Sequence, residues 1–355
     1  MAIMRCIAIL PIFCTTPMTT NKKEKTPLKF RADGKFKIVI FSDVQDQFPV
    51  HQRVISIMEQ ALEREKPDFV VFLGDQTEMN TKDPQVDFRR TIRQILEPVV
   101  RTSVPYAFVF GNHDDQCYYI GTRADKKRLL SVYQSIGDCR TYDANPNLTG
   151  AGTCKLPIYA SDGSGIVFLL WMVDSNTYQN PITEQGGYDN PHADQLAWMK
   201  ANNDAEVNSL VFQHIPMPEI YNLLLEDENG TKIYGGKKYA KALNINSLGS
   251  LGEFPCPCNA ENDMGEFATL KEMGNVLGVF TGHDHLNDFI GTYDGIDMVS
   301  VPGMTYFNYG DEAVRGYGVI ELRENNLSNY DYHSVKFSML DTEVEAFNKT
   351  LYDGV

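Results

Sequence analysis

Long apolar runs alternate with amphipathic segments along the chain from residue 35 onward. Several runs are continuous Val, Ile, Leu and Phe, which is typical of strands that are covered on both faces of a sheet. The runs end in turn-forming residues, and this alternation indicates an α/β domain. The predicted strands are residues 35–41, 68–74, 106–111, 166–174, 209–213, 276–282, 297–303 and 316–322.

Apolar residues with helical spacing follow the first predicted strand. They recur at i, i+3, i+4, i+7 and i+8, a pattern that places them on one face of a helix; they are Val54, Ile57, Met58, Ala61 and Leu62. The pattern predicts a helix over residues 50–66 with one buried stripe. A second helix is predicted over residues 87–103.

One long segment interrupts the periodic pattern. Residues 223–265 are rich in Gly, Asn, Glu, Lys and Pro, and a loop of this length inside a compact domain is usually functional or mobile. We interpret it as a lid. Because no internal repeat or linker divides the chain, we expect one domain over residues 35–325, preceded by an N-terminal arm (1–34) and followed by a polar C-terminal tail (326–355).

The charge of the chain bears on its partners. The 355 residues carry a formal net charge of −15. Proteins that bind nucleic-acid backbones neutralise phosphates with Lys and Arg. The acidic balance therefore argues against a nucleic-acid partner.

The N-terminus and the cysteines bear on location. The N-terminal apolar run is interrupted by Pro11 and is too short for a membrane span, so it is only a weak signal-peptide candidate. Seven cysteines, an odd number, match neither a zinc finger nor a dense disulfide framework. These features slightly favour a cytoplasmic location and leave secretion open as the alternative.

Ligand-type side chains follow five of the predicted strands, in the segments FSDVQ, FLGDQTE, FGNHDD, FQHIP and FTGHDH. The carboxyl ends of strands in an open α/β sheet form one rim, so residues far apart in sequence can converge there. A single Gly-Asp turn or a lone His after a strand is common, but five such ends in this order predict a shared site. The candidate ligands are numerous enough to hold two metal ions; they are Asp43, Asp75, Asn112, His214, His283 and His285.

The end of the first strand contributes a second polar residue. Gln45 stands two positions after Asp43, and side chains two apart on a strand point the same way. Taken alone, the pair is more typical of a polar loop that follows a buried strand. Together with the other strand ends, it predicts one wall of the metal site.

The order of these motifs resembles that of the calcineurin-like metallophosphoesterases, over residues 35 to about 325. The segments HIPMPE (214–219) and GHDHLND (282–288) are similar to the purple-acid-phosphatase-like branch of that superfamily. The resemblance implies a four-layer α/β/β/α sandwich, in which two packed mixed sheets are flanked by helices. It also implies a dinuclear metal centre at the strand ends.

Carried over by motif, the resemblance implies two sets of ligands that share Asp75 as a bridge. One ion would also be held by Asp43, Gln45 and His285, and the other by Asn112, His214 and His283. Two neighbouring cations polarise phosphoryl oxygens and acidify a bridging water, which becomes the attacking hydroxide.

The resemblance also implies a catalytic pair. His113 matches the residue that protonates the leaving oxygen or stabilises its charge, and Asp114 would orient the His113 ring. The alternative is that His113 only forms hydrogen bonds around the ligands.

Two positions depart from the family pattern. Glu78 stands where coloured purple acid phosphatases have a metal-bound Tyr, so we expect no purple iron centre. Gln45 stands where most members have His, and its neutral amide oxygen makes that half of the centre oxygen-rich. Oxygen ligands favour iron or manganese over zinc there. Gln45 either coordinates the ion or hydrogen-bonds a metal-bound water, and Asp46 is an alternative ligand.

These features predict a dinuclear metal-dependent phosphoesterase whose partner is a phosphorylated substrate, a monoester or a diester. Three alternatives remain. Gln45 supports a catalytically weak metal-binding scaffold of the same fold. A nuclease of the same fold conflicts with the acidic charge. A protein phosphatase would differ in specificity loops such as residues 223–265.

Overall fold

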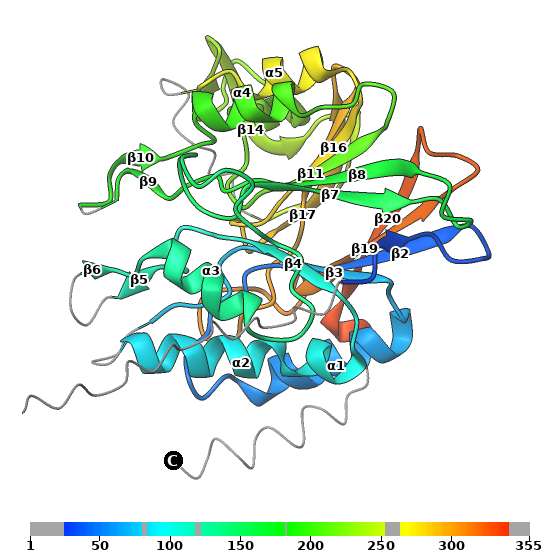
Figure 1. Cartoon of the computed structure of the whole chain (residues 1–355). Coiled ribbons are helices and arrows are strands. Elements are labelled where there is room, and N and C mark those ends of the chain that lie inside the picture. Colours follow the sequence, from blue (N-terminus) through cyan, green and yellow to red (C-terminus); the bar gives the residue numbers. More distant parts are fainter. Residues whose placement is uncertain (1–24, 80–83, 118–121, 182, 253–262, 341–355) are drawn as a thin grey trace, which may run out of the picture.

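Two β-sheets face each other at the centre of the molecule, and helices cover their outer sides (Figure 1). The structure is a computed structural model that describes residues 25–79, 84–117, 122–181, 183–252 and 263–340. From α1 and α2 on one side to α4 and α5 on the other, the layers follow the order helix, sheet, sheet, helix. The predicted four-layer α/β/β/α fold is confirmed.

The smaller sheet has five strands in the order β20-β19-β2-β3-β4. Strands β2, β3 and β4 are parallel, whereas β19 is antiparallel to both of its neighbours. The bounds are β2 (Lys35–Phe41), β3 (Phe69–Leu73), β4 (Tyr106–Val109), β19 (Gly316–Arg323) and β20 (Tyr330–Lys336).

The larger sheet has eight strands in the order β1-β7-β8-β11-β16-β18-β17-β15. Its central strands β8, β11, β16 and β18 are parallel. The bounds are β1 (Leu28–Lys29), β7 (Cys154–Tyr159), β8 (Ile166–Met172), β11 (Ser209–Phe212), β15 (Ser247–Leu251), β16 (Val276–Thr281), β17 (Asn287–Tyr293) and β18 (Ile296–Ser300).

Alternating side chains divide the interior into layers. On β2, Ile38 and Ile40 pack into the core between the sheets, while Val39 and Phe41 pack under helices. The helices on this side are α1 (Gln52–Glu65), α2 (Pro84–Thr102) and α3 (Lys126–Gln134). Helices α4 (Ala193–Ala201) and α5 (Glu266–Met273) cover the outer face of the larger sheet. Because both faces are covered, the strands read as continuous apolar runs in the sequence.

Smaller elements lie outside the two large sheets. The hairpins are β5 (Gln116–Cys117) with β6 (Thr122–Arg123), and β9 (Tyr178–Asn180) with β10 (Gln185–Tyr188). Two short 3₁₀ helices are η2 (Pro218–Leu223) and η4 (Phe337–Met339). The eight predicted strands and both predicted helices are present, with ends shifted by a few residues.

Residues 223–265 were predicted to form one long loop, and this prediction was wrong because the segment contains strands. It contains β15 and a separate three-stranded sheet of β12 (Leu224–Glu226), β14 (Lys237–Leu243) and β13 (Lys232–Tyr234). Gly235 and Gly236, both with positive φ, form the two-residue turn between β13 and β14, as is typical of tight hairpins. The part of the expected lid at residues 253–262 lies outside the described residues.

Both expected terminal segments contribute strands. Within the expected arm, β1 pairs with β7, and Leu28 and Phe30 are buried. Within the expected tail, β20 pairs with β19 from Leu322 to Gly316. Over the described ranges, no helix combines the length and apolarity needed to cross a membrane.

Candidate metal centre

Polar side chains from both sheets meet at the carboxyl ends of five strands. The loops after β2, β3 and β4 belong to the smaller sheet, and those after β11 and β16 to the larger one. Parallel neighbouring strands end at the same edge of a sheet, so their loops lie together. None of the predicted residues on these loops is more than 7% exposed: Asp43, Gln45, Asp75, Asn112, His214, His283 and His285.

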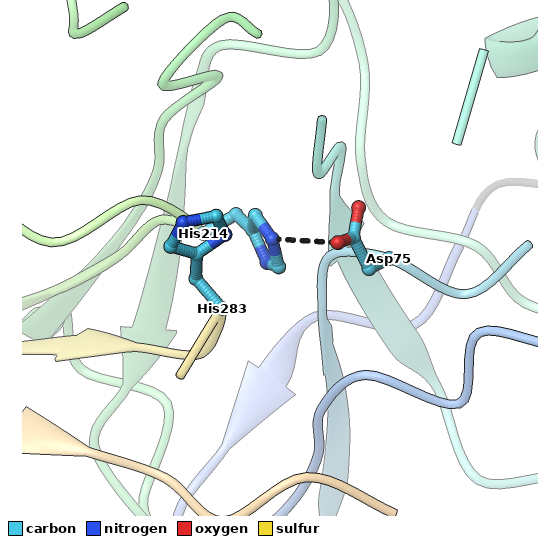
Figure 2. A group of neighbouring side chains, drawn as sticks. All are labelled: Asp75, His214 and His283. Atoms are coloured by element: carbon cyan, nitrogen blue, oxygen red, sulfur yellow. Dashed lines mark ion pairs between the residues drawn. The ribbon is translucent and has the colours of Figure 1, made fainter. Parts of the chain in front are cut away.

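The tightest group is formed by Asp75, His214 and His283. One potential ligand atom from each lies within 4.8 Å of the other two. Figure 2 shows the two imidazole rings beside each other and the carboxylate facing them. His214 Nε2 is 3.0 Å from Asp75 Oδ2, while His214 Nδ1 is 3.0 Å from the carbonyl oxygen of Leu73. The Nδ1–H therefore has a backbone acceptor, which leaves Nε2 directed to the centre.

A second group lies around Asp43. His285 Nε2 is 3.4 Å from Asp43 Oδ1, and His285 Nδ1 is 2.9 Å from the carbonyl oxygen of Tyr309. The Asp43 carboxylate also accepts hydrogen bonds from the Ser42 hydroxyl at 2.5 Å and the His283 backbone N–H at 3.1 Å. His214 Nε2 is 3.9 Å from Asp43 Oδ1. The two groups therefore adjoin at His214.

The backbone of the centre adopts an unusual conformation. Asp43, Gln45, Asp75 and His283 have φ of 51°, 44°, 49° and 74°, although residues other than Gly seldom have positive φ. The first two loops are tied together, because the Gln45 backbone N–H donates to the Asp75 carbonyl at 2.7 Å. Such strain persists only where the surrounding structure holds it, and it clusters at functional sites.

The glycines before two of the site residues are required by close packing. A Cβ on Gly111 would lie 2.1 Å from Asp75 Oδ1, and one on Gly74 would lie 2.4 Å from His214 Nδ1. Gly74 also has a φ of +93°, which favours Gly. The Gly-Asp and Gly-Asn-His motifs thus allow the loops to approach one another.

His113 borders the centre, and Asp114 has a different role from the one predicted. The His113 backbone N–H donates to Asp75 Oδ1 at 2.7 Å, and its ring Nδ1 is 2.5 Å from Gln116 Oε1. Asp114 instead accepts backbone hydrogen bonds from Gln76, Thr77 and Gly111 at 2.8, 2.9 and 2.8 Å. These contacts correct the prediction that Asp114 orients the His113 ring: its carboxylate ties the loop after β3 to the loop after β4.

Charges in the centre shift several pKa values. Burial would raise the pKa of Asp75, but the charges of His214 and His113 hold it well below its usual range. Burial would lower the pKa of His214, but the Asp75 carboxylate raises it to about 9. Burial and the charge of His214 lower the pKa of His283 to about 3. Burial, followed by the charge of Asp75, raises the pKa of Asp114 to about 7.

Three buried polar atoms at the centre have no hydrogen-bond partner among the described residues: Gln45 Oε1, Asn112 Oδ1 and His214 Nε2. Buried polar atoms are normally satisfied. The amide of Asn112 donates through Nδ2 to the Tyr178 hydroxyl at 3.3 Å, which leaves its oxygen to the centre. Amide oxygens and imidazole nitrogens are metal ligands, so the residues present fit bound cations.

The carboxylates of two neighbouring acidic residues accept hydrogen bonds from groups outside the centre. Asp46 accepts from the backbone N–H groups of Gln47 and His51, each at 2.7 Å, which disfavours it as the alternative ligand. Glu78 Oε2 accepts from Asn308 Nδ2 at 2.7 Å. Gln45, in the same loop as Asp43, instead has a buried side-chain oxygen without a partner among the described residues.

A hairpin that sequence analysis did not identify lies beside the histidines. On β10, the ring of Tyr188 meets the ring of His283 edge-on at 4.3 Å, and it stacks on Tyr178 of β9 at 5.1 Å. Arg123 pairs with Asp115 at 2.5 Å and with Glu184 at 3.1 Å. No motif marked these residues, because their role depends on a hairpin that folds back to the strand ends.

Comparisons with known proteins agree with this geometry. The chain matches the family described as calcineurin-like phosphoesterase over residues 36–287. It is 28% identical over 240 residues to Phosphatase DCR2 of Saccharomyces cerevisiae, covering 61% of this chain and 40% of the relative. It is 25% identical over 264 residues to Probable inactive purple acid phosphatase 29 of Arabidopsis thaliana, covering 64% of each. The chain therefore spans between 40% and 64% of the length of these relatives.

A solved structure supports the fold. A dimetal phosphatase from Danio rerio superposes with a TM-score of 0.52 at 15% identity, covering 81% of this chain and 93% of that one. At this identity the likeness shows the fold alone. The family match covers more than half of the chain, and the strand ends that it spans carry the acids, the amides and the histidines described above. This chain belongs to the calcineurin-like phosphoesterase family.

Proposed function

We propose that this chain is a dinuclear metal-dependent phosphatase that hydrolyses phosphate esters. The observation that carries the proposal is the convergence of buried ligand-type atoms from five strand ends. One carboxylate, Asp75, lies next to His214 and is tied through the backbone to the loops that carry Gln45 and His113. Its position suits a bridge between two ions.

The proposed ligands divide into two halves that share Asp75. The histidine-rich half consists of Asn112, His214 and His283, and the oxygen-rich half consists of Asp43, Gln45 and His285. Ions bound there would polarise the phosphoryl oxygens and lower the pKa of a coordinated water. The amide and carboxylate oxygens favour iron or manganese in the oxygen-rich half, whereas the imidazoles of the other half also suit zinc.

The remaining residues would position the ester and move a proton. His113 Nε2 lies 4.0 Å from Asp75 Oδ2, so the ring stands at the rim of the centre with one nitrogen directed to it. From there it would donate a proton to the leaving oxygen. Tyr188, in contact with His283, would border the bound ester.

The test is metal content and hydrolysis measured on one preparation. The purified chain should bind about two ions and hydrolyse a chromogenic phosphomonoester when iron, manganese or zinc is supplied. Asp75→Asn, which removes the shared charge with little change of shape, should lose both properties. Fewer than about one ion per chain together with no turnover in any of the three metals would refute the proposal.

The second candidate is a metal-binding scaffold with little catalysis. Two observations favour it: Gln45 replaces an imidazole by a neutral amide, and three relatives from Arabidopsis thaliana are named as probable inactive purple acid phosphatases. The same preparation separates the candidates, because a scaffold would retain ions without turnover.

A further inference from the structure

Two polar side chains lead from the hairpin β9–β10 to His113. Glu184 Oε1 accepts from Gln116 Nε2 at 2.5 Å, and Gln116 Oε1 lies 2.5 Å from His113 Nδ1. Gln116 is only 2% exposed, whereas the Glu184 side chain is 40% exposed. A buried amide thus connects a carboxylate at the surface with the imidazole at the centre.

The carboxylate determines which way the amide points. An ionised carboxylate only accepts hydrogen bonds, whereas an amide donates through nitrogen and accepts through oxygen. With its NH₂ group held by Glu184, Gln116 must present its oxygen to His113. Nδ1 of His113 therefore carries the hydrogen, and the other ring nitrogen, Nε2, exchanges protons with the centre.

Arg123 holds the carboxylate in place. Its guanidinium pairs with Glu184 at 3.1 Å and donates to the carbonyl oxygen of Asn112 at 3.1 Å and to that of Pro181 at 2.6 Å. The Arg123 side chain is 14% exposed. One partly buried cation thus joins the hairpin to the loop that carries both Asn112 and His113.

We propose that Glu184 and Gln116 are positioning residues that fix His113 in the tautomer with hydrogen on Nδ1, so that Nε2 serves the leaving group. The proposal rests on the proposed phosphatase function. A hydroxide derived from water forms the new phosphorus–oxygen bond as the bond to the leaving group breaks, and the departing oxygen takes a proton from Nε2 of His113. The neutral ring that remains keeps its Nδ1 hydrogen on Gln116, and water in the site returns the proton to Nε2.

Leaving groups of different basicity provide the kinetic test. Phenyl phosphate needs a proton on its leaving oxygen, whereas 2,4-dinitrophenyl phosphate has a leaving group that departs without one. In Gln116→Met, kcat for phenyl phosphate should fall by about tenfold to 100-fold, a part of what general-acid catalysis contributes. The kcat for the dinitrophenyl ester should stay within about twofold.

A surface variant guards against misfolding of the buried one. Glu184→Ala leaves Gln116 in place but frees its amide to rotate, so the same selective loss is expected. Asp189→Asn is the matched control: Asp189 follows β10 and pairs with His192, outside the three-residue connection. This control should hydrolyse both esters at the wild-type rate.

A spectroscopic readout separates this proposal from the function on which it rests. In protein labelled with ¹⁵N at histidine, the His113 signals, assigned by their absence in His113→Gln, should show hydrogen on Nδ1. Glu184→Ala should shift the ring toward the other tautomer. A wild-type His113 with its hydrogen on Nε2 only, or equal losses for both esters in the two variants, would overturn the proposal. Absence of turnover in the wild type would instead count against the phosphatase, and the tautomer measurement would still decide the positioning role.

Discussion

The two halves of the proposed centre are built differently. In the histidine-rich half, the ligand atoms of His214, His283 and the shared Asp75 lie within 4.8 Å of one another. In the oxygen-rich half, Asp43 already accepts from Ser42 and from the His283 backbone. The side-chain oxygen of Gln45, in the same loop as Asp43, has no partner among the described residues. One half is thus a tight cluster of imidazoles around a carboxylate, and the other combines a hydrogen-bonded carboxylate with a neutral amide.

Because of this difference, the histidine-rich half should bind its ion more tightly than the oxygen-rich half. Imidazole is a better ligand than an amide oxygen for most first-row transition metals. The Asp43 carboxylate accepts hydrogen bonds from the Ser42 hydroxyl and the His283 backbone, whereas the Asp75 carboxylate accepts one from the His113 backbone and turns its other oxygen to His214. We therefore expect the oxygen-rich half to lose its ion first.

The largest predicted effect comes from His214→Ala compared with His285→Ala. His214 Nε2 lies near both carboxylates, at 3.0 Å from Asp75 and 3.9 Å from Asp43, whereas His285 lies near Asp43. His214→Ala should lower metal content toward zero and kcat/KM by more than about 100-fold, beyond what loss of an outer-shell partner costs. His285→Ala should retain about one ion per chain.

Metal analysis after gel filtration, with thermal unfolding to verify folding, checks this pair. Equal losses in folded His214→Ala and His285→Ala would show that the two halves are equivalent.

The next effect comes from two glycines that pack against opposite halves. A Cβ on Gly111 would lie 2.1 Å from the Asp75 carboxylate and 2.4 Å from its backbone nitrogen, whereas one on Gly303 would lie 3.3 Å from His285. Gly111→Ala must therefore displace Asp75 and should cost about 1 to 3 kcal/mol of stability, as overpacking does, with about a tenfold loss of activity. Gly303→Ala should change both by much less. Urea unfolding and ester hydrolysis measure the contrast, and equal effects would contradict it.

Much of this architecture follows from local patterns in the sequence. The strands that carry the centre are long apolar runs, and the polar residue at each end could be read directly. The strands in residues 223–265 could not, because β14 has a single buried residue and contains Lys237, Lys238 and Lys241, so no buried face produces a periodic signal. The link between Gln116 and Glu184 spans 68 residues and depends on how a hairpin folds back, which no motif records.

The role of Asp114 was also beyond the sequence. Its place next to His113 suggested a partner for the ring. The sharp turn after β4 instead directs its carboxylate to the backbone of Gln76 and Thr77. Adjacent residues in a turn can point to opposite sides, so chain order alone does not assign their partners.

A smaller effect tests the amide in the oxygen-rich half. Gln45 has a φ of 44°, a conformation in which His is better tolerated than most residues, so Gln45→His is compatible with the backbone. An imidazole there should strengthen binding of the second ion by about 1 kcal/mol, which corresponds to roughly a fivefold change in affinity. Activity at limiting metal should therefore rise several-fold. Gln45→Ala is the control and should weaken retention. A decrease in Gln45→His would show that the amide oxygen is the better ligand in this wall.

A buried acid behind the histidine-rich half should affect the stability of the fold and leave metal binding unchanged. Glu266 Oε2 accepts a hydrogen bond at 3.3 Å from Nε2 of Gln213, the residue that precedes His214. Burial raises the pKa of Glu266 from 4.5 to about 8. Between these two values the folded chain holds a proton that the unfolded chain has lost. This group therefore makes the free energy of unfolding fall as pH rises, by up to about 1.4 kcal/mol per pH unit. Glu266→Gln has no carboxyl group to titrate. Urea unfolding should therefore show the free energy of unfolding of the variant rising relative to that of the wild type from about pH 5 to about pH 8. Metal content should not change, and a stability difference independent of pH would show that Glu266 is ionised in the folded chain.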